Sequence, residues 1–538
     1  MQSRKPLIMN QHQSPFFRLL PQELRDEIYQ NYVQEECGYS HDPTSETLRA
    51  AIGNAAKINL QYSCKKIAKE MDGMALRTNE VVFRTVRHSS DAGEPRSNAA
   101  LFEELLRYYR MRLRHMLKWA HTTVSVEVML TLKSLYPNSL AVQRMVETFK
   151  EGGDMDFQHG FVLKVWCLDD YHSGSILADL VTVMTTLPDF YYLTSKEYDL
   201  ELRRATESDD DDSNHDDDDS NHDDDESDPD DGDNDLDDDE AFSSGSDSDD
   251  SSLDIPLIIR PPSYSKKTQT DILQWRPKLW SIPTRAELEA ISEFLPPWPT
   301  ASDRPYLDDD YVPNVYFSAA TVAIRFLQRL SSENRQQLRK IVIQEDHPSV
   351  ASPKIHGQGL LPFCLANPKV RIERRVDVWR TEFVYSSNCF DYHAKEIVMM
   401  IGTWINEVKV LYQMGMPADC FTLVLHGPSE QASQQLSDAV IRAAIWLEGT
   451  VEIARREQRR FLPSEGITED FMDVIKEMIR GEIPARFDAE MGEVWDIEKI
   501  LSEHVGDWPS KVSDVFRLQD FDEPDGGWHA ALEAYKEV

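Results

Sequence analysis

The chain has 538 residues, 41% of them hydrophobic, and a formal net charge of -38 with a sequence pI near 4.7. At roughly 150 residues per domain, this length predicts three or four structural units. A surface of this sign repels nucleic-acid phosphate and anionic lipid, so nucleic acid is not an expected partner and basic proteins are the more natural one.

Membrane insertion and secretion are also disfavoured. The richest apolar run, Ile397 to Ile405, is half of the about 18 residues that a membrane-spanning helix needs, and the N-terminus lacks the apolar core of a secretory signal. The cysteines stand singly, without a C-x-x-C pair or a histidine at zinc-finger spacing. We therefore expect reduced thiols and a cytoplasmic or nuclear location. The six are Cys37, Cys64, Cys167, Cys364, Cys389 and Cys420.

The first 90 residues predict a small module of helix, helix and strand. Leucine, isoleucine and tyrosine recur every four residues, which places them on one stripe of a helix that Pro21 can start. The stripe comprises Leu20, Leu24, Ile28 and Tyr32, with Val33 beside it. A second amphipathic helix is indicated from Leu60 to Leu76, and the β-branched run from Glu80 to Val86 predicts a strand.

Residues 95–205 form a predicted helical middle domain. The pattern is helical from Ala99 to Lys150, with a turn at Tyr136 to Ser139. The apolar run Phe161 to Leu168 fits a buried strand or a helix equally well, because it is too short for its periodicity to decide.

A predicted disordered linker, residues 206–265, contains most of the negative charge. Glu207 to Asp254 holds 26 Asp or Glu, no Lys or Arg and four apolar residues, too few to offset the entropy of ordering it. One interpretation is a solvated linker between folded units, and the other is a tract that captures histones or other basic proteins. Its serines stand beside acidic residues, so phosphorylation would deepen the charge.

Residues 266–538 predict a mixed, mostly helical C-terminal domain. Thr284 and Glu287 form a capping-box pattern that predicts a helix start. Phe317 to Asp346 reads as two helices separated at Ser331 to Asn334, and Cys420 to Gly427 is the best strand candidate, followed by a long helix. The predicted fold class is therefore mainly α with minor β, an α+β arrangement.

Two basic clusters interrupt the acidic chain, Arg371 to Arg380 and Arg455 to Phe461. Arginine beside Trp379 has the chemistry to stack on bases or hold a phosphate. Interspersed acidic residues instead favour a salt-bridged helix face at the first cluster, and a solvated helix is the favoured interpretation of the second. Docking of the acidic tract onto these arginines is a third alternative.

No catalytic motif or cofactor-binding motif is evident. Ser429 follows a strand as a nucleophile elbow would, but the second glycine of G-x-S-x-G is missing, so a helix cap is the favoured interpretation. No metal-binding spacing such as H-E-x-x-H occurs. We therefore expect a non-catalytic protein without cofactor or metal.

The segment "LLPQELRDEIYQNYV", Leu19 to Val33, resembles the opening of the F-box. The matching residues are Leu20, Pro21, Glu23, Leu24 and Ile28. The module is more closely similar to an F-box-like N-terminal module of uncharacterised ascomycete fungal proteins, and Phe317 to Arg380 and "CFTLVLHG" are similar to their continuation. The matched positions of the module are Arg25, Tyr29, Leu60, Cys64, Ile67, Glu70, Leu76, Asn79 and Phe83.

The resemblance implies a substrate-recruiting adaptor that docks onto the linker subunit of a cullin-type ubiquitin ligase. Docking would set a helix face into a groove of that subunit. The expected partner-binding residues are Leu20, Pro21, Leu24, Ile28 and Val33. Packing of the same stripe inside the module is the competing interpretation. An acidic scaffold or chaperone for basic nuclear proteins, and an enzyme within the C-terminal domain, are the alternative functions.

Overall fold

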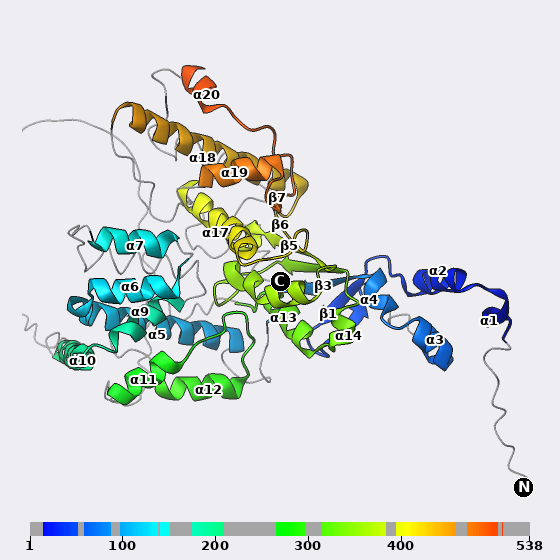
Figure 1. The fold of residues 1–538 in the computed structure, drawn as a ribbon, viewed down its shortest axis with the longest axis horizontal. Coiled ribbons are helices and arrows are strands. Elements are labelled where there is room, and N and C mark those ends of the chain that lie inside the picture. Colours follow the sequence, from blue (N-terminus) through cyan, green and yellow to red (C-terminus); the bar gives the residue numbers. More distant parts are fainter. Residues whose placement is uncertain are drawn as a thin grey trace, which may run out of the picture.

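The structure is a computed structural model that describes residues 14–51, 59–87, 97–137, 140–150, 175–207, 265–295, 315–382, 394–458, 471–503 and 508. Helices predominate around one seven-stranded sheet (Figure 1), in agreement with the predicted mainly α fold with some β structure. The predicted disordered linker falls almost entirely outside the described residues, as does Phe161 to Leu168.

The sheet joins strands from both ends of the chain. Its order is β2-β1-β3-β4-β5-β6-β7, and only β1 and β2 pair antiparallel. The predicted strand β3 lies beside β4, with Val82 opposite Val342. The sequence did not reveal this pairing, which makes the N-terminal module continuous with the C-terminal sheet. The strands are β1 Tyr39–Asp42, β2 Thr47–Ala50, β3 Glu80–Arg84, β4 Lys340–Glu345, β5 Arg371–Asp377, β6 Phe421–His426 and β7 Ala485–Phe487.

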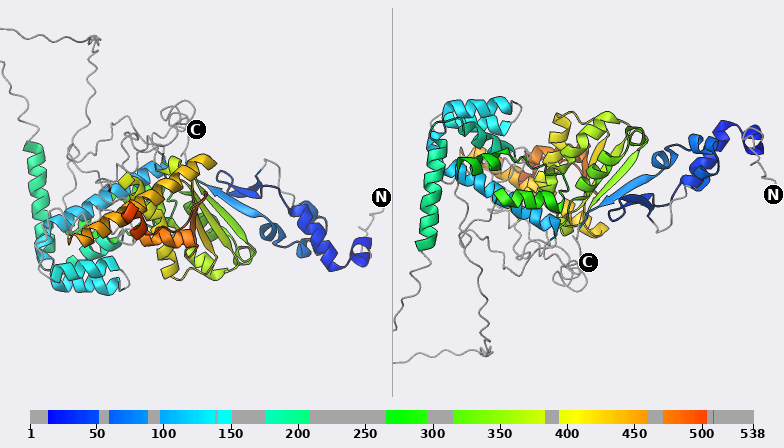
Figure 2. Two further views of the ribbon diagram at one scale, coloured as in Figure 1. Left: turned by 90° about the horizontal axis from the view of Figure 1, so that it is seen from above. Right: turned by 90° about the horizontal axis from the view of Figure 1, so that it is seen from below.

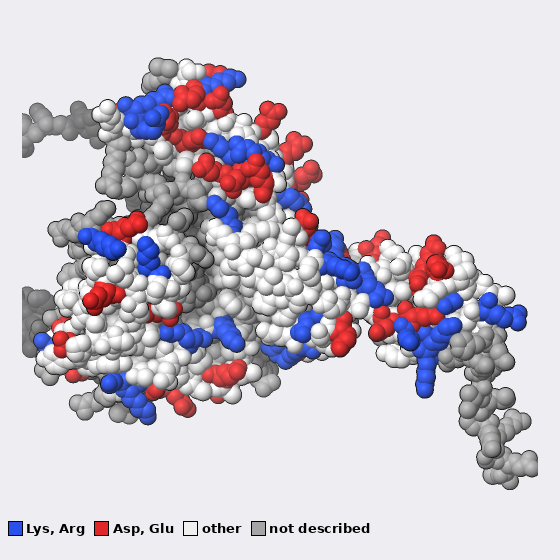
Figure 3. Space-filling view, viewed as in Figure 1, with Lys and Arg blue, Asp and Glu red and all other residues white. Residues whose placement is uncertain are grey.

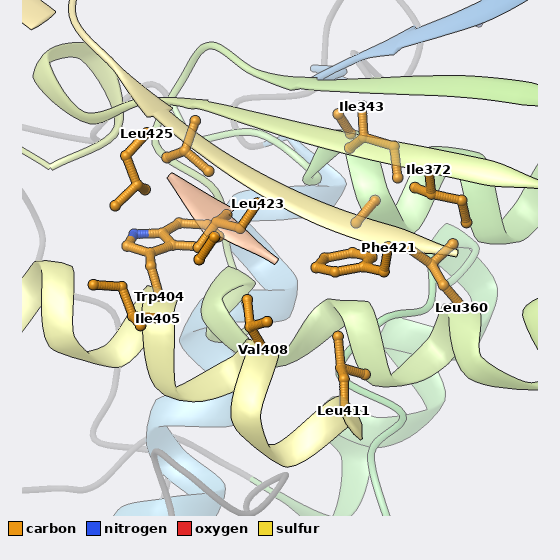
Figure 4. Close-up of a cluster of buried hydrophobic side chains, with 14 of the residues drawn as sticks. Ile343, Leu360, Ile372, Trp404, Ile405, Val408, Leu411, Phe421, Leu423 and Leu425 are labelled. Carbon is orange, nitrogen blue, oxygen red and sulfur yellow. The ribbon is translucent and has the colours of Figure 1, made fainter. Parts of the chain in front are cut away.

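One face of the sheet holds the larger hydrophobic core. Side chains alternate along a strand, and the register aligns Val81, Ile341, Ile372 and Phe421 in one row of this core. Figure 4 shows Trp404, Ile405, Val408 and Leu411 of one helix facing Phe421, Leu423 and Leu425. The elements that cover this face are α13 Ala319–Arg329, η7 Pro353–Leu360, α15 Leu361–Ala366, α17 Ala394–Gln413, α18 Glu430–Arg456 and α19 Phe471–Arg480.

A group of helices packs around a second core, beside the sheet (Figures 1 and 2). The predicted capping box is confirmed, because Thr284 and Glu287 exchange bonds at the start of α12. Val350 and Ala351, in the loop after β4, and Ile355 of η7 belong to this second core and so connect it to the sheet. The helices are α5 Asn98–Trp119, α6 Val126–Leu135, α7 Leu140–Lys150, α9 Ser175–Met184, α10 Phe190–Glu207, α11 Lys266–Gln274 and α12 Arg285–Phe294.

The N-terminal module projects from the edge of the sheet (Figure 1). It comprises α1 Pro15–Leu19, α2 Gln22–Val33, η2 Asn59–Tyr62, α3 Lys65–Glu70 and α4 Met74–Thr78, besides its strands. The single helix predicted from Leu60 to Leu76 is therefore wrong. Gly73, at φ 63°, stands between α3 and α4 in a left-handed conformation that favours glycine and breaks the helix.

Two further sequence predictions are corrected. After the short α14, Ser332–Arg335, the predicted second helix is strand β4, because Ile341, Val342 and Ile343 pair with strands on both sides. The basic cluster Arg371 to Arg380 is not a helix face either. It forms the inner strand β5 and then the short α16, Val378–Thr381. The remaining short helices are η3 His121–Thr123 and α20 Ile497–Glu503.

Candidate protein-binding surface

Helix α2 turns its polar and aromatic side inward and part of its aliphatic side outward. Arg25, Tyr29 and Val33 are buried, whereas Leu24 is 47% exposed and Ile28 is 43% exposed. Exposed leucine and isoleucine one turn apart form an apolar strip on the surface. The strip has the spacing that helix-in-groove recognition uses.

An ion pair fixes which side of α2 faces inward. The Arg25 guanidinium donates to both carboxylate oxygens of Glu70, from Nε at 3.0 Å and from Nη2 at 2.7 Å, and the Tyr29 hydroxyl donates to Glu70 at 2.9 Å. These bonds stabilise the ionised carboxylate, and the Arg25 bond is the main reason that the pKa of Glu70 lies below its usual value. Arg25 also donates to the Leu20 carbonyl at 2.7 Å, which holds the turn between α1 and α2.

Two more residues of the family-like pattern make internal contacts. The Asn79 side chain donates to the carbonyls of Val33 and Ala75 and accepts from the Glu35 amide, so it closes the end of α2 onto α4. Cys64 accepts from the Ile67 amide at the start of α3. The pattern residues therefore build the module, around a small core of Tyr29, Val33, Ile67, Met71 and Met74.

The five expected partner-binding residues do not share one environment. Leu20 is partly buried, Pro21 is exposed at the N-cap of α2, and Leu24 and Ile28 are exposed. Val33 is only 1% exposed, in the module's own core, so its assignment to a partner-facing surface is wrong. Its position five residues after Ile28 carries it around the helix to the inner side.

Two further exposed apolar residues lie in the same module, and the sequence did not predict them. Leu19, at the end of α1, is 66% exposed and Tyr62, in η2, is 76% exposed. Neither belongs to a periodic pattern long enough to show its orientation, so no signal in the sequence could have found them.

A buried charge cluster lies at the carboxyl end of the sheet. Arg374 of β5 pairs with Glu345 of β4 at 2.7 Å and with Glu407 of α17 at 2.6 Å, and all three side chains are almost fully buried. Glu345 also accepts from the amides that begin α13, and Glu407 accepts from the Gly357 amide. Burial nevertheless raises the pKa of Glu407 to about 7, since desolvation outweighs its attraction to Arg374.

His356 forms a second buried polar centre nearby. Its Nε2 donates to the Ala351 carbonyl at 2.8 Å, so Nδ1 is the acceptor for the hydroxyls of Ser318 and Thr321. Burial lowers the pKa of His356 to about 3, which keeps the ring neutral. Its bond to Ala351 steadies a backbone that is left-handed at both Ala351 and Ser352.

A cavity of about 370 Å³ opens beside this loop. Lys354 pairs with Glu382 at 3.1 Å on its wall, and the Trp404 indole donates to the same carboxylate. These three wall groups bond to one another, and Ser352, also on the wall, accepts a hydrogen bond from Arg110. The buried groups behind the wall hold the junction between the two cores.

The structure decides between the two interpretations of Ser429. Ser429 is the N-cap of α18, where its hydroxyl accepts from the Ala432 amide, as the favoured interpretation expected. Within the described residues, no group of three or more His, Cys, Asp or Glu could hold a metal ion. None of the helices described is both long and apolar enough to cross a membrane.

No protein-family model, curated protein or solved structure matches the chain.

Proposed function

We propose that the protein is a non-catalytic F-box-like adaptor. Its outward α2 strip would dock onto the linker subunit of a cullin-type ubiquitin ligase, and the sheet and helical cores would present a substrate. The proposal rests on the two different sides of α2. Arg25 and Tyr29 bond to Glu70 inside the module. Leu24 and Ile28, on the other side, remain exposed.

The internal contacts also supply rigidity for such a dock. A docking helix loses less conformational entropy on binding when its orientation is already fixed. The Arg25 to Glu70 pair and the Asn79 bonds fix α2 against α3 and α4. Leu24 and Ile28 are therefore held outward before a partner arrives.

The test is a binding titration of the full-length protein with the purified linker subunit. We expect Leu24→Glu with Ile28→Glu to weaken binding at least about tenfold, which corresponds to about 1.4 kcal/mol, because a groove that accepts two aliphatic side chains cannot solvate two carboxylates. Circular dichroism of both proteins checks that the variant is folded.

The matched control places the same charges on another exposed helix face. Leu130 and Leu135 of α6 are 43% and 53% exposed, much like the α2 pair. Leu130→Glu with Leu135→Glu should leave the affinity unchanged. Failure of the folded wild-type protein to bind the linker subunit would overturn the proposed function.

A further inference from the structure

Basic side chains gather at the amino ends of the central parallel strands. Arg339 and Lys340 enter β4, Lys369 and Arg371 enter β5, and the Arg371 amide donates to the Arg339 carbonyl at 2.8 Å. Arg335 ends α14, shortly before β4, and Arg77 of α4 donates to Gln337 in the loop between α14 and β4. We call the six residues Arg77, Arg335, Arg339, Lys340, Lys369 and Arg371 the basic edge. Figure 3 shows blue side chains grouped where the sheet meets α4.

The side chains of the basic edge have few carboxylate partners among the described residues. Within the described part of the chain, only Lys340 of the six pairs with a carboxylate, that of Glu80 at 2.6 Å. Arg455 and Arg456 differ from these side chains, because both of them pair with Glu452. Positive charge is therefore concentrated at the basic edge without matching negative charge.

The arginines of the basic edge are oriented but not saturated. Among the described residues, each of the four arginines uses only Nη1 for its hydrogen bonds. Arg339 donates to the carbonyls of Gln336 and Leu338, and Arg371 donates to those of Pro368 and Val370. Arg335 donates to the Leu327 carbonyl and Arg77 to the Gln337 side chain. Among the described residues, their Nη2 groups have no hydrogen-bond partner, so they remain able to form the paired bonds that guanidinium makes with carboxylates.

The chain carries its own carboxylate-rich segment. Glu207 to Asp254 contributes -26 of the net charge of -38, and it contains no basic residue. The rest of the chain is itself acidic by -12, so the basic edge is a local exception. Closely spaced carboxylates attract a group of several arginines and lysines through their charge, without the need for a particular sequence.

The tether lengths allow the two to meet. Helix α10 ends at Glu207 and α11 begins at Lys266. The intervening stretch is about 190 Å long when fully extended, so its middle can lie about 95 Å from its anchors. A compact folded chain of this size has a radius of gyration of only about 24 Å. A tethered segment of this kind has an effective concentration on the order of millimolar, which favours a contact within one chain over one between chains.

We propose that the basic edge binds the acidic tract of the same chain. The inference does not depend on adaptor activity, because it involves neither α2 nor a ligase.

The test is carbodiimide cross-linking of the full-length protein, which joins lysine amines to carboxylates, followed by peptide mass spectrometry. We expect Lys369 and Lys340 to form cross-links to Glu207–Asp254 several times more often than the exposed Lys65 and Lys69 of α3. Raising the salt from 0.1 to 1 M shortens the screening length from about 10 to about 3 Å and should abolish this preference.

Two further measurements make the result specific. Arg339→Gln with Arg371→Gln leaves both reporter lysines in place and should reduce their cross-links several-fold, whereas Arg455→Gln with Arg456→Gln should not. A mixture of ¹⁵N-labelled and unlabelled protein should give cross-links within single isotopic species. Equal cross-linking at Lys65 and Lys369, no effect of the edge variant, or cross-links mainly between labelled and unlabelled copies would each overturn the proposal.

Discussion

The N-terminal module and the central sheet use buried arginine in different ways. In the module, Arg25 and Glu70 join α2 to α3 over a core of five buried hydrophobic residues. In the sheet, Arg374 lies within a row of core side chains, between Ile343 and Leu423, and is shared by two carboxylates. The module thus depends on its ion pair for orientation, whereas the sheet has an extensive apolar core and a buried charge that must remain paired.

The largest expected effect comes from Arg374→Met. It leaves Glu345 and Glu407 buried without their cation, and removing one partner of a buried pair costs about 3 to 5 kcal/mol. We expect loss of cooperative unfolding or a drop of that size, measured by chemical denaturation. Arg375→Met, next along β5 but on the partly exposed face, is the matched control and should cost at most about 1 kcal/mol. Similar effects of the two substitutions would contradict the contrast.

A smaller and local effect is expected from Arg25→Met. The Arg25 and Glu70 side chains are 7% and 11% exposed, so losing the pair should destabilise the module by about 2 kcal/mol. Hydrogen exchange should quicken in α2 and α3 while β4 to β6 keep their protection. Lys66→Met removes a cation 4.0 Å from the same carboxylate and should change little. Uniformly faster exchange across the sheet would refute a local role.

The pH dependence of the unfolding free energy should reveal the contribution of His356. Its pKa is about 3 in the folded protein and about 6.5 when unfolded, so the unfolded state binds the extra proton between these values. Stability from this group therefore falls as the pH drops from 6.5 toward 3, by at most about 1.4 kcal/mol per pH unit. Glu407 acts in the opposite direction, since its raised pKa makes its contribution grow as the pH falls from about 7 toward 4.5.

The wild type and His356→Gln both contain Glu407, so its contribution cancels when their unfolding free energies are compared. Normalised to their values at pH 8, the unfolding free energies should diverge below pH 6.5, with the wild type declining faster. Parallel curves would mean that His356 becomes protonated without unfolding.

The smallest stability effect should follow Leu24→Glu with Ile28→Glu. Both side chains are exposed, so the melting midpoint should change by the equivalent of about 0.5 kcal/mol or less. Val33→Glu, on the inner side of the same helix, should unfold the module because it buries an unpaired charge. If the outer pair destabilised the module as much as Val33→Glu, the outward assignment would be wrong.

The sequence predicted the elements whose signal is local. Strand β6 and the helix after it, the Ser429 cap and the Thr284 capping box each depend on a few adjacent residues, and each is confirmed. Strand β5 was missed because its acidic residues, interspersed among arginines, resemble a salt-bridged helix face. Its core-facing Arg374 is paired with Glu345 and Glu407, about 30 residues away in either direction, which no local pattern indicates.

The candidate surface was predicted in part for the same reason. Periodicity found the apolar stripe of α2 but could not say which side the module would bury. That choice depends on Glu70, 45 residues after Arg25, which draws Arg25 and Tyr29 inward and leaves Leu24 and Ile28 outside. Val33 was assigned to the surface because it adjoins the stripe, although it turns toward Met71 and Met74 in the core.

Hydrogen exchange of the full-length protein, with and without the linker subunit, tests the central claim most directly. If the outward side of α2 is the docking surface, added protection should appear in α1 and α2 and be absent from Leu24→Glu with Ile28→Glu, while α3, α4 and β3 exchange at the same rate in both proteins. Added protection confined to other elements, or none in the wild type, would contradict the account.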